Sequence, residues 1–362
     1  MTPPAIQAGV ARARGIKTEL RARAAIVFFF FLFQIVVASF GLSVTHSQVP
    51  SSDGSLNPQG SEANANLAEQ LNGGAVQPPD SLTVQNPASE DQSTHWRPLL
   101  DEQLSQWEVF TGVPHKSVSI EGFPPSKSHD CRKGKPFGLG DPKNVYSVAV
   151  TDGVPVLHVS GEMYAGLTSR EEFENFHLST EFKWGEKRWH PRKTMKRDSG
   201  ILFHCTGKQG AFWNVWMRCF QCQVQEDDVG DLIRLGGTSC EVRVTPETES
   251  KATPHHSPNG NWCTIGPGAR KWGVKRFGNH EIAGDWNQIE VYAVGDRAVF
   301  SVNGHPVMHL KNTRIGKYKA AQPLTRGKIQ VQSEAAEVWY RDMKIRPIGK
   351  LPAKLAAHFE EH

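Results

Sequence analysis

The sequence lacks the motifs by which several large classes of protein hold their ligands. It has no glycine-rich phosphate loop and no nucleophile elbow of the serine-hydrolase type. Its formal net charge is only +4 over 362 residues, and the basic side chains beyond residue 25 are scattered. Nucleotide-driven and serine-based chemistry are therefore not expected, and neither is a nucleic-acid partner.

Helical periodicity is also scarce, and the chain has neither an internal repeat nor a long amphipathic helix. Strand-type alternation is abundant instead, as in FHLSTEFKWG (176–185), where apolar and polar side chains take turns. Turn signals such as Asp152-Gly153 and Asn303-Gly304 separate these stretches. About a dozen short strands with frequent turns predict an all-β fold, a two-sheet antiparallel β-sandwich or jelly roll.

Only the N-terminal region holds a long hydrophobic run. Residues 24–44 are nearly uncharged and follow five basic residues, a pattern typical of a signal peptide or a signal-anchor. Export is therefore expected, to a periplasm, a cell surface or the medium, with cleavage or membrane anchoring of this run left open. We expect four parts: a signal segment (1–45), a disordered linker rich in Ser, Asn, Gln, Gly and Pro (46–93), a β-sandwich domain (94–348) and a tail (349–362).

Cysteine is sparse, with six residues in the whole chain. An even number in an oxidising compartment permits disulfides. The pair in CFQC, Cys219 and Cys222, resembles half of a redox or zinc motif, but on a strand the two side chains point to opposite faces. We favour buried thiols or long-range bridges.

Carboxylates are missing where a sugar-cleaving sandwich enzyme often has them. In MRCFQCQVQEDDVGDL (217–232), alternate strand positions carry Gln221, Gln223 and Gln225. A glycosidase needs two carboxyl groups about 5 to 9.5 Å apart, and an amide can serve neither as nucleophile nor as proton donor. Ordinary two-carboxylate hydrolysis is therefore not expected from this strand.

Parity divides the same strand into two faces. Phe220, Cys222 and Val224 share one face, which we expect in the core. The glutamines share the other face, where amides could hold sugar hydroxyls because they both donate and accept hydrogen bonds. A solvated sheet face is the equally weighted alternative. Two acidic residues after the strand, Asp228 and Asp231, join the glutamines as candidate substrate-binding residues.

Tryptophans are concentrated in the central third of the domain. Flat indole rings suit the C–H faces of sugars, and their N–H groups can stay in contact with water. Trp213 and Trp216 flank the loop GAFWNVWMR and are the candidate platforms.

Four charged or titratable residues on neighbouring segments are the candidate catalytic residues. Glu181 and Lys183 share the polar face of one strand, Arg197 precedes SGILFHCTG, and His204 lies within that strand. If the chain is an enzyme, these residues should converge with Gln223 in one concave pocket.

His204 carries most of this hypothesis. Alternation places it opposite Ile201, Phe203 and Cys205, on a polar face. There it could be a general base or a metal ligand, whereas a hydrogen-bonded structural histidine is the alternative. No cofactor is certain, and a divalent metal stays open.

Several blocks, in order, resemble a known family. FENFHLSTEFKW, DSGILFH, CQVQEDDVGDL, GDWNQIEVY, SVNG and GKIQVQSE…VWYRDMKI together resemble the 3-keto-disaccharide hydrolase domain family over about residues 104–348. The resemblance implies a concanavalin-like jelly roll in an exported protein, and cleavage of glycosidic bonds in sugars oxidised at carbon 3. Family members often have glutamate at the position of Gln221 and asparagine at that of Asp198.

The implied chemistry suits a strand without an acid pair. A 3-keto group acidifies the proton on carbon 2, so the leaving group can depart by elimination with one base and one electrophile for the enolate oxygen. His204 or a carboxylate would be the base, and Lys183, Arg197 or a metal the electrophile. The alternatives are a non-catalytic carbohydrate-binding module and a structural surface protein. A saccharide is the expected partner, and the sequence leaves the oligomeric state open.

Overall fold

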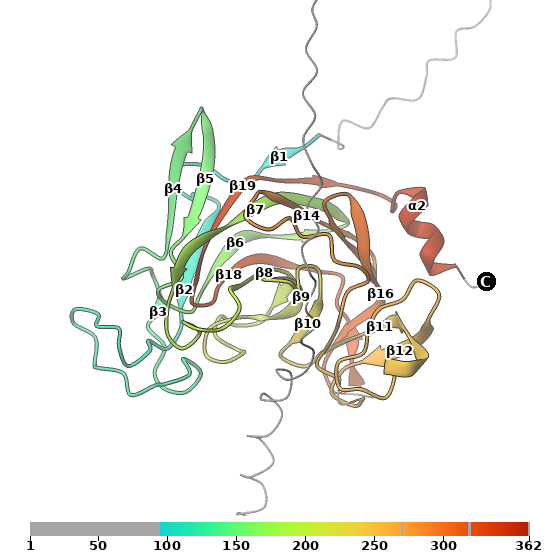
Figure 1. Ribbon diagram of the computed structural model, residues 1–362, viewed down its shortest axis with the longest axis horizontal. Helices are drawn as coiled ribbons and strands as arrows, with labels where there is room; N and C mark the ends of the chain where they lie inside the picture. The colour runs from blue at the N-terminus through green and yellow to red at the C-terminus, as the bar shows by residue number, and fades with distance from the viewer. Residues whose placement is uncertain (1–94, 270, 318–319, 361–362) are drawn as a thin grey trace, which may run out of the picture. The chain divides into compact units, whose positions relative to one another are not determined.

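Strand alternation produces two antiparallel β-sheets that pack face to face, which confirms the predicted fold class (Figure 1). The structure, a computed structural model, describes residues 95–360 apart from residues 270 and 318–319. The expected signal segment and linker lie outside the described residues. Within the part described, no helix is long and apolar enough to cross a membrane.

The larger sheet, here called the β7 sheet, has eleven strands among the described residues. Its main path runs β12 (Asn261–Ile265), β11 (Thr238–Val244), β16 (His305–Ile315), β15 (Arg297–Val302), β14 (Asn287–Val294), β7 (Phe176–Arg188), β19 (Ala336–Pro347), β5 (Val154–Val159) and β4 (Tyr146–Thr151). Off this path, β1 (Arg97–Pro98) pairs with β19 and β17 (Gln322–Pro323) pairs with β16.

The second sheet, here called the β9 sheet, contains eight strands in the described part of the chain. Its order is β13 (Gly273–Val274), β10 (Leu232–Leu235), β9 (Arg218–Gln225), β8 (Asp198–Thr206), β18 (Arg326–Ser333), β6 (Ala165–Glu174), β2 (Trp107–Thr111) and β3 (Gly138–Leu139). Strands β8, β9 and β18 are therefore neighbours, although β18 is far from the other two in sequence.

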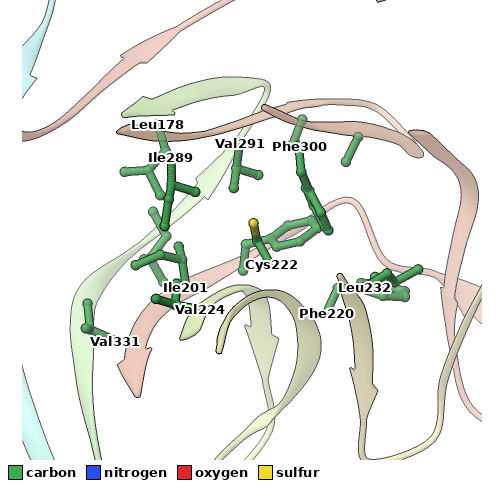
Figure 2. Close-up of a cluster of buried hydrophobic side chains, with 14 of the residues drawn as sticks. Leu178, Ile201, Phe220, Cys222, Val224, Leu232, Ile289, Val291, Phe300 and Val331 are labelled. Carbon is green, nitrogen blue, oxygen red and sulfur yellow. The ribbon is translucent and has the colours of Figure 1, made fainter. Parts of the chain in front are cut away.

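The core between the sheets confirms the parity expected for β9. Phe220, Cys222 and Val224 are fully buried there and face residues of the β7 sheet such as Val291 and Phe300 (Figure 2). Each large apolar side chain buried in this way contributes roughly 1.5–3 kcal/mol to folding. The polar row on β9 must consequently face away from the core.

The six cysteines are all buried and unbonded. Cys222 lies in the core between the sheets, whereas Cys219 lies in a separate cluster on the outer face of the β9 sheet. The two cysteines of CFQC therefore point to opposite faces, as strand geometry predicts, and form neither a redox pair nor half of a zinc site.

The predicted position of His204 on the polar face of β8 is wrong, because the strand is irregular at this residue. The β8–β9 register shifts between Phe203 and Thr206, and His204 has φ 51°. Its ring turns into the core beside Phe176 and Phe203, at centroid distances of 5.9 and 5.0 Å, while Cys205 takes the outer face. Nδ1 is buried without a hydrogen-bond partner among the described residues.

The chain's last described segment forms a short α-helix, α2 (Ala353–Ala356), followed by a 3-10 turn, η4 (Ala357–Phe359). Another 3-10 turn, η2 (Pro246–Thr248), follows β11. Leu355 and Phe359 pack with Val299 in a small cluster on the outer face of the β7 sheet.

Burial makes His204 a source of acid sensitivity. Desolvation lowers its pKa to about 3, below the ordinary value of 6.5. A histidine depressed in this way contributes stability that is present above pH 6.5 and is lost as the pH falls toward 3. From this residue alone, the free energy of unfolding should fall by about 2 kcal/mol between pH 6.5 and 5.

We expect His204→Phe to fold and to lose less stability on acidification than the unmodified chain. Urea unfolding at pH 7 and pH 5 measures this difference, and His255→Phe, at an exposed position, is the matched control. Equal acid losses in the His204→Phe variant and the unmodified chain would show that His204 does not titrate in this way.

Candidate functional site

The outer face of the β9 sheet carries a connected row of polar side chains. Gln221 is 3% exposed and Gln223 8% exposed, so this face is neither open nor solvated. An apolar cluster that includes Leu202, Cys219 and Trp216 lies beside the row. The row is therefore an internal polar layer, and the interpretation as a solvated sheet face is wrong.

Hydrogen bonds link the glutamines of β9 to residues of β18 and to the turn that follows it. Gln221 Nε2 donates to Gln332 Oε1 at 2.9 Å and also to Gln223 Oε1. Gln332 Nε2 in turn donates to Glu334 Oε2 at 2.8 Å. From Gln221 through Gln332 the donors thus point toward the carboxylate of Glu334, while Gln221 also donates in the other direction, to Gln223.

A buried arginine joins this chain to a second carboxyl group. Arg192, from the loop between β7 and β8, places NH2 2.7 Å from Asp198 Oδ2 and NH1 3.5 Å from Glu334 Oε1. Gln225 Nε2 donates to Asp198 Oδ2 as well. The guanidinium therefore lies between two carboxyl groups that are more than a hundred residues apart in the sequence. We call these three residues the Arg192 triad.

The triad is nearly sealed from solvent, since Asp198, Glu334 and Arg192 are 3%, 5% and 8% exposed. Two carboxyl groups beside one guanidinium would leave one uncompensated negative charge in a desolvated layer. Burial raises the pKa of Asp198 well above its ordinary value, and the nearby Glu334 adds to that rise. Burial also raises the pKa of Glu334, against the opposing effect of Arg192. A pair of this kind retains one proton more readily than isolated carboxyl groups do.

Two polar atoms of the triad make no hydrogen bond with any described residue. They are Arg192 Nε, a donor, and Asp198 Oδ1, an acceptor, and both are buried. Buried polar atoms are normally paired, because leaving one unpaired costs roughly 1–3 kcal/mol. The triad therefore contains one donor and one acceptor that no described residue satisfies.

A glycine on β8 makes room for the amide chain. A methyl group at Gly200 would overlap the side-chain amides of Gln221 and Gln332, which meet above its backbone. Residues larger than glycine would therefore separate β9 from β18 at the point where the amide chain crosses β8.

The predicted catalytic residues do not converge, so this part of the sequence interpretation is wrong. Glu181 and Lys183 lie on β7, in the other sheet, and Glu181 pairs with Arg341. Arg197 lies nearer the triad, but it pairs with Glu226 at 2.7 Å. His204 lies in the core. None of Glu181, Lys183 and His204 therefore reaches the outer face of the β9 sheet, where they were expected to act with Gln223.

The predicted tryptophan platforms are also corrected in part. Trp216 is 1% exposed, stacks on Tyr164 and donates to the Ala165 carbonyl at 3.2 Å, so it is a core residue and offers no open face. Trp213 is half-buried, with the Arg132 guanidinium 3.7 Å from its ring centroid. That cation–π contact orders the loop over the β9 sheet.

One lysine bridges the two acidic residues after β9, and a second lysine, Lys196, pairs with Asp228 at 3.1 Å. Lys275 Nζ lies 2.7 Å from Asp228 and 2.8 Å from Asp231. Both carboxylates thus have a partner, and Asp231 is also bonded to the backbone N–H of Arg276. They close the turn beside the amide row and do not point an unpaired group at it.

Sequence reasoning missed Arg192, Gln332 and Glu334. These residues lie in a loop, on a late strand and in a turn, and their local patterns resemble ordinary surface segments. The available signal was the alternation in IQVQSE (329–334), which repeats the amide pattern of β9. Among the described residues, no group of three or more His, Cys, Asp or Glu is arranged to hold a metal ion.

Removing the charge of Arg192 should strongly destabilise the domain. In Arg192→Met two buried carboxyl groups lose their counter-charge, and breaking such a buried arrangement costs roughly 3–5 kcal/mol. The loss should be largest at pH 8 and smaller at pH 5, where the carboxyl groups of the variant are protonated. Urea unfolding at both pH values measures it.

The matched control for this variant is Arg326→Met. Arg326 also bridges two carboxylates, Glu172 and Glu174, but all three side chains are about half exposed. A loss of at most about 1 kcal/mol is expected there. Equal losses in the two variants would contradict the idea that burial gives the triad its importance.

The amide chain also predicts that glutamate is not tolerated at residue 221. In Gln221→Glu an ionised carboxylate would face the oxygens of Gln223 and Gln332, and Gln332 cannot reverse without turning its oxygen toward Glu334. We expect a loss of roughly 1–3 kcal/mol at pH 7, recovered in part at pH 5, in urea unfolding. The exposed Gln322→Glu is the control; an unchanged midpoint in Gln221→Glu would contradict the assigned direction.

Comparison with known proteins supplies the family. Residues 95–346 match the 3-keto-alpha-glucoside-1,2-lyase-like domain. A comparison with curated proteins finds no match. The matched region covers both sheets and the whole Arg192 triad.

Solved structures with a similar fold are distant. A glycosyl hydrolase candidate from Parabacteroides distasonis has 17% identity and a TM-score of 0.36, with 70% of this chain and 100% of that chain covered. A carbohydrate binding module from Bacillus subtilis has 10% identity and a TM-score of 0.33, with 56% and 91% covered. A protein with a galectin-like fold, also from Bacillus subtilis, has 12% identity and a TM-score of 0.36, with 70% and 94% covered.

These scores carry no argument about activity, and the assignment depends on the family match over most of the folded region. The chain belongs to the 3-keto-alpha-glucoside-1,2-lyase-like domain family.

Proposed function

We propose that this chain cleaves the glycosidic bond of 3-keto glycosides by elimination at the Arg192 triad. The observation that carries the proposal is the buried pair of carboxyl groups, Asp198 and Glu334, on one guanidinium. Elimination needs a base for the carbon 2 proton, an electrophile for the carbon 3 oxygen and an acid for the leaving group. A carboxyl pair that retains one proton, beside an arginine, supplies all three.

The steps balance without an external reagent. The ionised carboxylate takes the proton from carbon 2, and the electron pair moves into an enolate whose oxygen lies against Arg192. The enolate collapses to the 3-ketone, a double bond forms between carbons 1 and 2, and the bond from carbon 1 to the leaving oxygen breaks. The protonated carboxyl gives its proton to that oxygen, so the pair again holds one proton.

The two departures from the family pattern support this assignment when they are taken together. Where relatives often have glutamate, this chain has Gln221, and where they often have asparagine it has Asp198. One acid is lost and one is gained within a single hydrogen-bonded layer. Under this proposal the acid lies at the start of β8 and not on β9.

A carbohydrate-binding module without catalysis is the second candidate. The observation that favours it is that both carboxyl groups of the triad are already paired with Arg192. Under this alternative the triad orders the site and transfers no proton. Export of the chain, which the apolar run at residues 24–44 predicts, is part of the proposal in both forms.

Neutralising either carboxyl group should separate the two candidates. We expect Asp198→Asn and Glu334→Gln each to lower kcat on a 3-keto-glucoside by roughly 10²–10⁴-fold, because general acid–base catalysis is worth about that much. Release of the aglycone measures kcat, and calorimetric titration of the same compound measures binding.

The control for this experiment is Glu172→Gln, at an exposed carboxylate paired with Arg326 outside the triad. Binding of the 3-keto-glucoside without aglycone release by the unmodified chain would favour the module. Full turnover by both triad variants would refute the acid–base assignment.

A further inference from the structure

The β7 sheet has a cleft of its own, on the face turned away from the Arg192 triad. Its volume is about 930 Å³, at the upper end of the range for small-molecule sites. Strand β19 alternates here: Val338 and Tyr340 are fully buried in the core between the sheets, so Trp339 and Arg341 stand on the outer face. Figure 1 shows the hairpin of β4 and β5 extending beside these strands, and its residues Asp152 and Val154 line the cleft.

Three half-buried tryptophans line this cleft, of which Trp184 packs its ring against the core beside Phe182: Trp184, Trp286 and Trp339. Trp339 lies at the centre of the floor, opposite Lys183 on one side and His158 on the other. Its ring stacks on His158 at 4.1 Å between centroids, and His158 is anchored to Glu337 at 2.9 Å. The indole is therefore held by its neighbours before any ligand arrives.

The other two tryptophans are also fixed by polar partners. The Arg341 guanidinium lies 4.0 Å from the ring centroid of Trp286 and pairs with Glu181. Trp184 Nε1 donates to Glu281 at 3.1 Å. Fixed rings lose little side-chain entropy when a ligand stacks on them, which favours binding.

Charges in the lining almost cancel. Four acidic residues face three basic ones: Asp152, Glu186, Glu337 and Asp342 against Lys183, Lys187 and Arg341. Lys187 and Glu337 pair at 3.6 Å. A strongly charged polymer, for example a nucleic acid or a polyanionic glycan, would therefore meet side chains of its own charge. An uncharged ligand with apolar faces and hydroxyl rims fits this mixture of rings, donors and acceptors best.

We infer that this cleft is a second saccharide site, which holds a neutral oligosaccharide against Trp339. It goes beyond the proposed elimination, which uses none of its residues. Lys183 belongs to this cleft. Its side chain makes no ion pair or hydrogen bond with any described residue, so its ammonium group is a donor for a sugar hydroxyl. This role differs from the catalytic one that the sequence suggested for Lys183.

The test is calorimetric titration of the full chain with three neutral hexasaccharides: cellohexaose, laminarihexaose and chitohexaose. At least one should bind, and Trp339→Ala should weaken that binding by about tenfold or more, since tryptophan anchors dominate such contacts. Trp339→Phe should retain most of the affinity. Affinity retained in Trp339→Phe would show that Trp339→Ala weakens binding by removing the aromatic ring and not by damaging the fold.

The matched control is Trp272→Ala, a tryptophan that is 47% exposed and lies outside the cleft. It should bind as the unmodified chain does. Turnover of a 3-keto-glucoside should be unchanged in Trp339→Ala, so failure of the elimination proposal and failure of the cleft proposal give different results. Equal binding by Trp339→Ala and the unmodified chain, or no binding of any of the three sugars, overturns the second site.

Discussion

The site of this protein depends on one buried charge. Arg192 lies between Asp198 and Glu334, and desolvation makes this arrangement costly unless all its hydrogen bonds are in place. Since Glu334 accepts from Gln332, the Gln332 oxygen must face Gln221, and Gln221 must then donate. The carboxylate of Glu334 therefore sets the orientation of Gln332 on β18 and of Gln221 on β9.

This dependence explains why amides, and not acids, occupy β9. A carboxylate at residue 221 would oppose the row's direction and add a negative charge to a buried layer that already holds two carboxyl groups on one guanidinium. The strand itself therefore has no carboxyl group on this face, although two carboxyl groups lie on other segments of the same face. A carboxylate count along one strand could not reveal them.

The sequence predicted the architecture well because strand parity is a local property. The faces of β9, the split of Cys219 from Cys222 and the two-sheet fold all follow from alternation and turns. The prediction for the position of His204 failed for the same reason. A single irregularity in β8 reverses the parity, and no residue pattern in SGILFHCTG marks it.

The site itself could not be predicted, because it is built from long-range contacts. Arg192 and Glu334 are separated by more than a hundred residues, and neither lies in a regular strand. Only the pairing of β18 with β8 brings Gln332 and Glu334 beside Asp198. Sequence alternation identifies which side chains share a face, but the strand order decides which faces meet.

Residues 198 and 221 belong to one hydrogen-bonded layer, and in this chain the carboxyl group stands at residue 198 and the amide at residue 221. The group then stands beside Arg192 at the end of the layer, where burial raises its pKa. The family's fold therefore transfers to this chain more securely than its catalytic positions do, because the family match covers both sheets and assigns no role to any residue.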